Sequence, residues 1–228
     1  MSSSATDPTS TTGSSEHLGS DLAGRPEAEI VTCGALAGHI RAIAARRGWQ
    51  VRVHALPAAL HNRPEKIPLA VESAGNRQGG RPPGDAQPGA PAIIGYADCG
   101  TYGKLDQLAE RAGVKRLPGL HCYDLYAGAD TISDVFHVEP GTYLLTDYLV
   151  RTFDRTVAGS LGLDRHPELW PDYFGHYTRV AWLAQEPSPG LHAEAERIAA
   201  RFGLPLTIIE TGLSRLEAAL EELLEENE

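Results

Sequence analysis

The sequence predicts an α/β fold: a three-layer arrangement of a mostly parallel sheet with helices on both faces and a C-terminal helical portion. Short apolar runs of strand length alternate with segments whose apolar residues recur at helical spacing, and this alternation is typical of parallel sheets. The chain has 228 residues and is 42% hydrophobic, which suits one globular domain with a sizeable core. We expect this domain to span residues 28–228.

Strand and helix signals alternate through the first half of the chain. Residues 28–33 are an apolar run that ends in Cys-Gly, and residues 35–48 have helical spacing with a basic last turn. Residues 49–56 alternate and are rich in Val, which predicts a second strand parallel to the first. A polar loop at 57–67 leads to a short helix through 69–73.

The same pattern then recurs. Residues 91–100 again run into Cys-Gly, residues 101–113 are a predicted helix, and residues 114–119 a predicted short strand. Farther along the chain we expect residues 141–146 to be a strand or the segment that leads into a helix, followed by helices at 147–163, 170–185 and 191–203. A strand at 204–211 and a final helix at 212–226, with leucines on one face, complete the prediction.

Two segments differ in composition from the rest. Residues 1–27 are dominated in their first part by Ser, Thr and Gly and predict a disordered leader, without the apolar core of a signal peptide. Residues 74–91 are dense in Gly, Pro and Arg, which predicts a mobile surface insertion or lid.

Charge and cysteine usage limit the partners and the compartment. The net charge of -10, without a local basic run, argues against a general nucleic-acid binder. No stretch approaches the roughly 20 apolar residues of a membrane span. Three cysteines without an export signal make a disulfide framework improbable, so we expect a cytoplasmic protein. We also expect a small-molecule ligand, because α/β sheets bind ligands at the carboxyl ends of their strands.

The three cysteines are the main chemical signal. Cys33, Cys99 and Cys122 each lie beside a glycine or a histidine at a predicted strand end. Three thiolates that converge from separate strand ends could hold one zinc ion and leave a fourth position open, as in catalytic zinc sites. An iron–sulfur cluster is a less favoured use of the same residues. The alternative is that the cysteines only fill space in the core.

Other residues near these cysteines are candidates for catalysis or ligand binding. His61 and His121 could serve as a fourth metal ligand or a general base, and Asp98 as a catalytic carboxylate or a helix cap, a duty for which Thr101 competes. Gly34 and Gly100, together with Thr101, would allow a cofactor to approach the strand-to-helix turns closely. The aromatic residues of 170–182 either line a planar ligand or, as we prefer, pack in the core.

Several uncommon strings occur in one order: IVTCGAL, LPAALHNRPEKI, GYADCGTYGKLD, LPGLHCYDLYAG, EPGTYLLTDYLVRTFD, LGLDRHPELWPDYFGHYTRVAWLAQ and TGLSRLE. On these strings the chain resembles the family catalogued as domain of unknown function 1638, from residue 28 to about 220. The leader and the insertion at 74–91 fall outside the shared pattern.

The resemblance implies a role beside corrinoid proteins and methyltransferases of one-carbon metabolism. Thiolate-bound zinc would suit that chemistry as a Lewis acid, and the protein would then be a metal-dependent methyltransferase-type enzyme. The chain lacks the DxHxxG run that resembles a cobalamin-binding loop, so we do not expect it to carry the corrinoid. The alternatives are a non-enzymatic protein that delivers a cofactor to a methyltransferase, and a globular protein whose cysteines are only structural.

Overall fold

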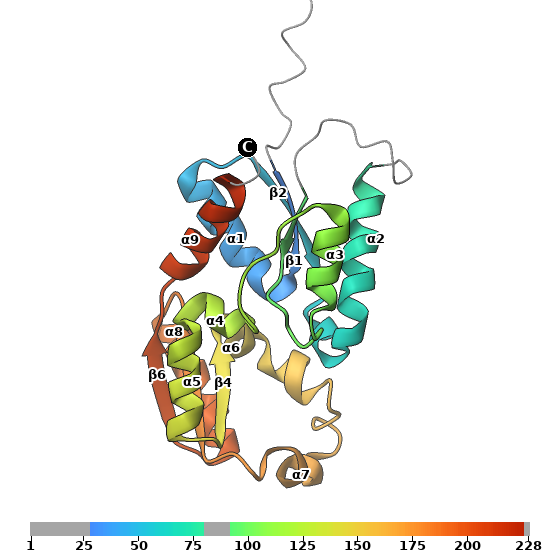
Figure 1. Ribbon diagram of the computed structural model, residues 1–228. Helices are drawn as coiled ribbons and strands as arrows, with labels where there is room; N and C mark the ends of the chain where they lie inside the picture. The colour runs from blue at the N-terminus through green and yellow to red at the C-terminus, as the bar shows by residue number, and fades with distance from the viewer. Residues whose placement is uncertain (1–27, 80–91, 226–228) are drawn as a thin grey trace, which may run out of the picture.

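Parallel strands form two separate sheets in the computed structural model, which describes residues 28–79 and 92–225 (Figure 1). The first sheet has the order β2-β1-β3 and the second the order β4-β5-β6. All of the pairings within the two sheets are parallel, which confirms the α/β class. The strands are β1 (Ala28–Cys33), β2 (Val51–Leu56), β3 (Ala92–Gly95), β4 (Thr142–Thr146), β5 (Arg179–Ala184) and β6 (Leu206–Glu210).

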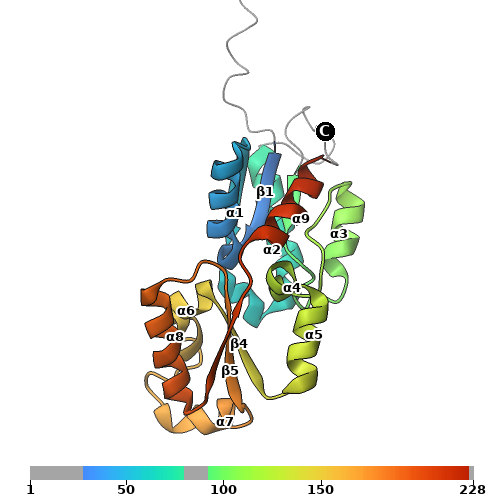
Figure 2. The same ribbon diagram turned by 90° about the vertical axis from the view of Figure 1, so that its left-hand side faces the viewer.

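Helices cover both faces of each sheet. We call β1–β3 with α1, α2, α3 and α9 the first lobe, and β4–β6 with α5, α6, α7 and α8 the second lobe; α4 lies where the lobes meet (Figures 1 and 2). The bounds are α1 (Gly34–Arg47), α2 (Ile67–Gly79), α3 (Lys104–Ala112), α4 (Cys122–Ala127), α5 (Ala129–Val138), α6 (Asp147–Phe153), α7 (Trp170–Phe174), α8 (Pro189–Phe202) and α9 (Ser214–Glu225). Shorter helical turns are η1 (Ala58–Asn62), η2 (Pro64–Lys66), η3 (Asp154–Ala158) and η4 (Pro167–Leu169).

The C-terminal helix returns to the first lobe. Leu216, Leu220 and Leu223 of α9 are buried in the same core as Ile40 and Ile43 of α1. Figure 2 shows α9 lying along the first lobe although β6, the strand before it, belongs to the second. The predicted C-terminal helix is therefore confirmed, and it ties the two lobes together.

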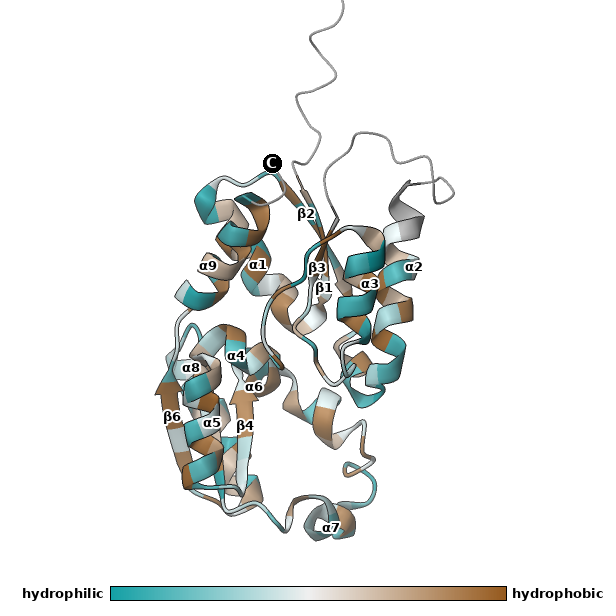
Figure 3. Ribbon diagram, in the orientation of Figure 1, coloured by the Kyte–Doolittle hydropathy of each residue, from teal (hydrophilic) through white to brown (hydrophobic). Residues whose placement is uncertain are grey.

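Apolar side chains concentrate on the strands and on the helix faces that cover them (Figure 3). In the second lobe Trp182 and Leu145 are fully buried, and Phe153 packs with them. A cluster of aromatic rings joins Phe153 to Tyr143 and Phe202 at one end of this core. Burial of this apolar area is the main term that stabilises each lobe.

Four segments differ from the expectations. Residues 114–119 form only an isolated bridge between Ile94 and Arg116, since Pro118 has no backbone N–H to donate. Residues 170–185 are not one helix: the short α7 is followed by β5. The helices α4 and α5 were not predicted.

The expected insertion begins later than residue 74. Residues 74–79 continue α2, and Ala74 is buried in the first core. Its remainder, 80–91, and the expected leader, 1–27, lie outside the described residues. Within the described part of the chain no helix combines the length and the apolarity needed to cross a membrane.

Candidate functional site

A cavity of about 320 Å³ lies between the lobes. Ala35 and Ala58, which line it, follow β1 and β2, and Thr146, the last residue of β4, lines it from the other side. The carboxyl ends of both sheets therefore meet at this cavity, the edge at which α/β folds bind ligands. Its wall consists of Ala35, Ala58, Ala59, His61, Asn62, Cys122, Tyr123, Tyr143, Thr146, Tyr148, Leu149, Thr156, Val157, Ser160, Leu161 and Phe174.

The predicted cysteines come together beside this cavity. We call Cys33, Cys99 and Cys122, with His61 and Tyr96, the thiol cluster. Cys33 is the last residue of β1, and its Sγ accepts a hydrogen bond from Ala35 N at 3.3 Å, so this thiol caps α1. Cys122 is the first residue of α4 and lines the cavity. The two cysteines thus start two helices that approach one site.

A paired loop brings Cys99 to the same place. Cys99 N donates to Leu120 O at 2.8 Å, and Asp98 N donates to Gly119 O at 3.0 Å. This pairing holds the loop after β3 against the segment that leads into Cys122. Cys99 itself has a φ of 52°, a left-handed conformation that non-glycine residues adopt at a cost of about 1 kcal/mol or more.

The thiols are strongly desolvated and affect one another. Burial raises the pKa of Cys33 to about 11 and that of Cys99 to about 12, the latter with a contribution from Cys33. Burial raises the pKa of Cys122 well above its ordinary value, with contributions from Cys99 and Cys33. The mutual effect shows that the three sulfur atoms share one electrostatic neighbourhood, and all three are protonated at pH 7.

Two buried polar atoms of the cluster have no hydrogen-bond partner. His61 Nδ1 lies 3.0 Å from Ala58 O and therefore carries the proton, which leaves Nε2 with a free lone pair and no partner. The same Nδ1 is 3.7 Å from Cys33 Sγ. Burial lowers the pKa of His61, with His121 acting in the same direction. Tyr96, which is 0% exposed, stacks on His61, and its hydroxyl is also unpaired.

These atoms stand out in the described part of the chain. There, the only other buried side-chain N or O without a hydrogen bond is His54 Nε2, which lies 3.7 Å from a Glu29 carboxylate oxygen. Because buried polar groups are almost always paired, two unpaired atoms in one cluster indicate a place where a ligand completes the bonding.

The other predicted site residues serve the turn before α3. Asp98 accepts hydrogen bonds from Thr101 Oγ1 at 2.8 Å and Gly103 N at 2.8 Å. Burial opposes its ionisation, but these bonds and one from Tyr102 N lower its pKa overall. Gly100 has a φ of 80°, which favours glycine. A catalytic role for Asp98 and a cofactor role for Thr101 and Gly100 stay predictions.

Gly34 and His121 occupy different surroundings. A Cβ atom on Gly34 would lie 3.0 Å from Leu56 O, so the close packing of α1 against the end of β2 requires glycine. His121 is exposed and stacks on Tyr123 with ring centroids 6.3 Å apart. His61 is therefore the histidine that the fold places in the cavity wall beside a thiol.

The side chains of the thiol cluster do not form a ready metal site. Across residues 28–79 and 92–225, no group of three or more His, Cys, Asp or Glu is positioned to hold a metal ion. The donor chemistry, three thiols and an imidazole with a free lone pair, nevertheless suits zinc. Binding of a metal by these residues would require side-chain rotation.

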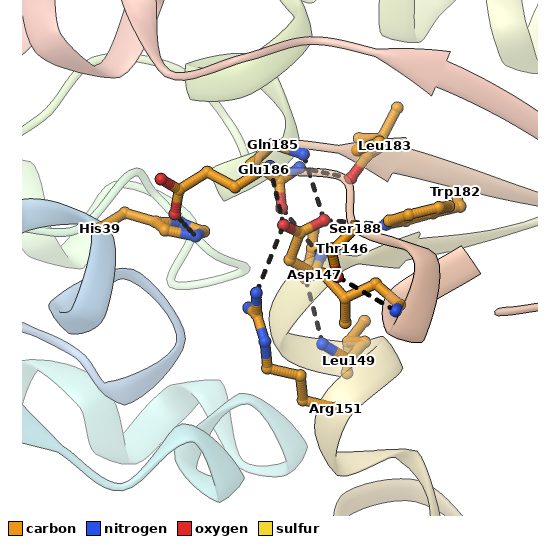
Figure 4. A network of polar contacts seen from close by, with 12 residues as sticks. His39, Thr146, Asp147, Leu149, Arg151, Trp182, Leu183, Gln185, Glu186 and Ser188 are labelled. Atoms are coloured by element: carbon orange, nitrogen blue, oxygen red, sulfur yellow. Dashed lines mark hydrogen bonds and ion pairs between the residues drawn. The ribbon is translucent and has the colours of Figure 1, made fainter. Parts of the chain in front are cut away.

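A second polar cluster, which we call the Asp147 network, lies where α1 meets the second lobe (Figure 4). Asp147 is 0% exposed and accepts hydrogen bonds from Trp182 Nε1 at 2.9 Å, Gln185 N at 3.1 Å and Glu186 N at 2.8 Å. Its own N–H donates to Gln185 Oε1 at 2.8 Å, and Arg151 lies 3.8 Å away.

His39 of α1 connects this network to the first lobe. His39 Nε2 lies 3.7 Å from a Glu186 carboxylate oxygen, and its Nδ1 is 2.8 Å from the Tyr126 hydroxyl. Burial lowers the pKa of His39 although Asp147 and Glu186 act in the opposite direction. The network joins the lobes through hydrogen bonds that are largely complete.

Sequence reasoning missed Tyr96, Asp147 and the cavity wall of the second lobe. A signal existed for β5, because residues 180–184 are a continuous apolar run of the kind that buried parallel strands show. The preferred core role of the aromatic segment is confirmed for Phe174, which also lines the cavity. Nothing local marks Tyr96 or Asp147, whose roles depend on distant partners.

Comparison with known proteins gives a family without an assigned activity. The family model described as "Protein of unknown function (DUF1638)" matches residues 55–220. No curated protein matches the chain, and no solved structure matches it either. The matched region contains every residue of the cavity wall except Ala35, including His61 and Cys122. It also contains Tyr96 and Cys99. The chain belongs to the DUF1638 family.

Proposed function

We propose that this protein binds a small molecule in the interlobe cavity, and that Cys33, Cys99 and Cys122 bind zinc beside it in the service of methyl-group transfer. The observation that supports the proposal is the position of His61, whose Nδ1 lies 3.7 Å from Cys33 Sγ and whose Nε2 lone pair is unused. The pKa of Cys122 responds to both Cys99 and Cys33, so the other two thiols are nearby. Thiolate and imidazole are the ligands that zinc prefers in proteins.

The hydrogen bonding of His61 supports a role as a ligand. Histidines that bind metals usually donate their other ring N–H to a carbonyl or carboxylate, which fixes the tautomer and the orientation of the ring. His61 Nδ1 makes such a bond to Ala58 O. The side chain is thus held with Nε2 available, either to a metal or to a proton of a bound molecule.

The state of the thiols makes metal uptake dependent on pH. Because burial raises the pKa of all three thiols, zinc must displace their protons when it binds. Zinc affinity should therefore increase as the pH rises. The neutral thiols of the metal-free protein also avoid the repulsion that three adjacent thiolates would cause.

A zinc ion with an open position supplies Lewis-acid activation of a bound molecule. The methyl-transfer part of the proposal rests on the family resemblance, which implies a corrinoid protein or a methyltransferase as partner. His61, in the cavity wall, would position the molecule or exchange a proton with it. A stable complex with a corrinoid protein, without turnover, would instead favour a delivery role.

Elemental analysis of protein prepared without oxygen tests the metal. We expect about one zinc per chain in the wild type and less than about 0.2 in a Cys33→Ser, Cys99→Ser, Cys122→Ser variant. His61→Ala should weaken zinc retention, whereas His137→Ala, at an exposed position on α5, should not. Circular dichroism checks that each variant is folded. A wild type with less than about 0.2 metal per chain under these conditions overturns the zinc site.

A further inference from the structure

We infer that the interlobe cavity selects a small uncharged organic molecule with an apolar or aromatic body, and that it rejects carboxylates and phosphates. The inference rests on the proposed function, because it names the class of ligand for the same cavity. It is carried by the wall itself, in which no Lys, Arg, Asp or Glu appears among the described lining residues.

The polar side chains of the wall are of neutral kinds: hydroxyls, an amide, an imidazole and a thiol. Burial raises the pKa of the Tyr143 hydroxyl, which therefore keeps its proton near pH 7. A wall without cations gives an anion nothing to replace its hydration, and an unpaired buried charge is costly.

The hydroxyls of the second lobe do not compensate for the missing cations. Thr156 Oγ1 donates to Thr152 O at 2.9 Å, and Ser160 Oγ lies 2.7 Å from Thr156 O. Both protons are committed to helix carbonyls, so these hydroxyls can only accept hydrogen bonds from a ligand. These two oxygens therefore disfavour a carboxylate or phosphate oxygen beside them and suit a donor such as an alcohol.

Most of the remaining wall is apolar, and its polar members, such as Asn62, Thr146 and Tyr148, carry no formal charge. Tyr143 and Phe174 make an edge-to-face pair with ring centroids 5.6 Å apart, and both contact Phe202 in the aromatic cluster. Leu149, Val157 and Leu161 add aliphatic surface. The volume of about 320 Å³ is at the lower end of the range for ligand pockets, which fits a small molecule.

Two cations on nearby elements, Arg151 and Arg179, contact other partners. Arg151 extends from α6, the helix that supplies Tyr148 and Leu149, but it lies 3.8 Å from the Asp147 carboxylate. Arg179 of β5 donates to Thr142 Oγ1 at 2.7 Å and to Val135 O at 2.8 Å. Neither side chain belongs to the cavity wall.

Four probes of one shape and different charge test the inference: benzyl alcohol, benzylamine, benzoate and phenyl phosphate. Binding to the full-length protein, kept free of metal with a chelator so that no zinc ion can bind the anions, is measured by titration calorimetry or ligand-observed NMR. We expect benzyl alcohol to bind at least about tenfold more tightly than either anion. Equal or tighter binding of an anion, tightest binding of benzylamine, or no binding of any probe overturns the inference.

Two substitutions at exposed wall positions locate the binding and sharpen the test. Ala59→Trp should fill the cavity and weaken benzyl alcohol binding by about tenfold or more, whereas Ala129→Trp, at an exposed position outside the wall, should not. Ser160→Lys places a cation in the wall, and benzoate binding should then approach that of benzyl alcohol. If Ala59→Trp leaves binding unchanged, the probe binds elsewhere.

Zinc content separates this inference from the proposed function. Ala59→Trp should lose the probe and keep its zinc, because Ala59 supplies no metal ligand. The triple cysteine variant should lose zinc and keep the preference for the uncharged probe, since the wall of the second lobe is intact. A protein that holds zinc but prefers anions refutes only the ligand class.

Discussion

The thiol cluster and the Asp147 network are both buried polar clusters at the junction of the lobes, but they differ in how completely their hydrogen bonds are made. Asp147 has three N–H donors around one carboxylate. In the thiol cluster, His61 Nε2 and the Tyr96 hydroxyl have none. A buried polar group stabilises the fold only when it is paired, so the Asp147 network is the structural cluster, and we propose the thiol cluster as the one that takes a ligand.

Removal of the Asp147 carboxylate is expected to have the largest effect on stability. Asp147→Ala leaves Trp182 Nε1 and the Gln185 N–H buried without an acceptor and removes the acceptor of the part-buried Glu186 N–H. The free energy of unfolding should fall by about 3 kcal/mol or more, because each buried donor left unpaired costs about 1–3 kcal/mol. Urea unfolding followed by circular dichroism measures the loss.

Asp154→Ala is the matched control for that variant. Asp154 is exposed and pairs with Arg197 at 2.9 Å and Arg201 at 3.0 Å. Loss of these surface ion pairs should cost less than about 1 kcal/mol. If the two aspartate variants are equally stable, the Asp147 network is not the structural cluster.

Two tyrosine variants compare the clusters directly, with opposite expected signs. Tyr126→Phe removes a hydroxyl that pairs with His39 Nδ1 at 2.8 Å and should cost about 1 kcal/mol or more. Tyr96→Phe removes an unpaired buried hydroxyl and should stabilise the ligand-free protein by about 1 kcal/mol. Thermal unfolding of both variants beside the wild type gives the result. A loss of stability in Tyr96→Phe would show that its hydroxyl has a partner in the free protein.

The pH dependence that a single thiol contributes is expected to be about as small as the effect of either tyrosine variant. Burial raises the pKa of Cys33 from about 9 to about 11, so the unfolded chain loses this proton first as the pH rises. The stabilisation is complete below pH 9 and is lost between pH 9 and pH 11, with about 1 kcal/mol lost from Cys33 by pH 10.

Urea unfolding of metal-free protein with a chelator, at pH 7.5 and pH 10, measures this term. Cys33→Ala lacks it and also weakens the influence of Cys33 on Cys99, so its stability should fall less between the two pH values than that of the wild type. Identical losses in the two proteins would contradict a raised thiol pKa.

The sequence was most informative where local patterns suffice. The strands at 28–33 and 204–211 and the helices at 35–48 and 191–203 follow from periodicity and capping, and the structure confirms them. The failures have local causes too. Residues 170–185 begin with aromatic residues at helical spacing, which masked the strand at their end.

The candidate site was predicted only in part. Cys33, Cys99, Cys122 and His61 were named from their places beside predicted strand ends. The structure places Cys33 Sγ 3.7 Å from His61 Nδ1, and a joint site of all four residues stays a prediction. Tyr96 was not named, because an unpaired hydroxyl is a property of its surroundings and not of its residue type. Whether the thiols bind zinc stays a prediction.

By itself the sequence determined most of the secondary structure, the parallel strands and the positions of the thiols along the chain, because these depend on spacing and on backbone geometry. Only the tertiary structure decided that the strands divide into two sheets, that α9 returns to the first lobe and that the two carboxyl edges meet around an uncharged cavity. The physical reason is that burial, pKa and hydrogen-bond pairing depend on residues far apart in sequence, which only packing brings into contact.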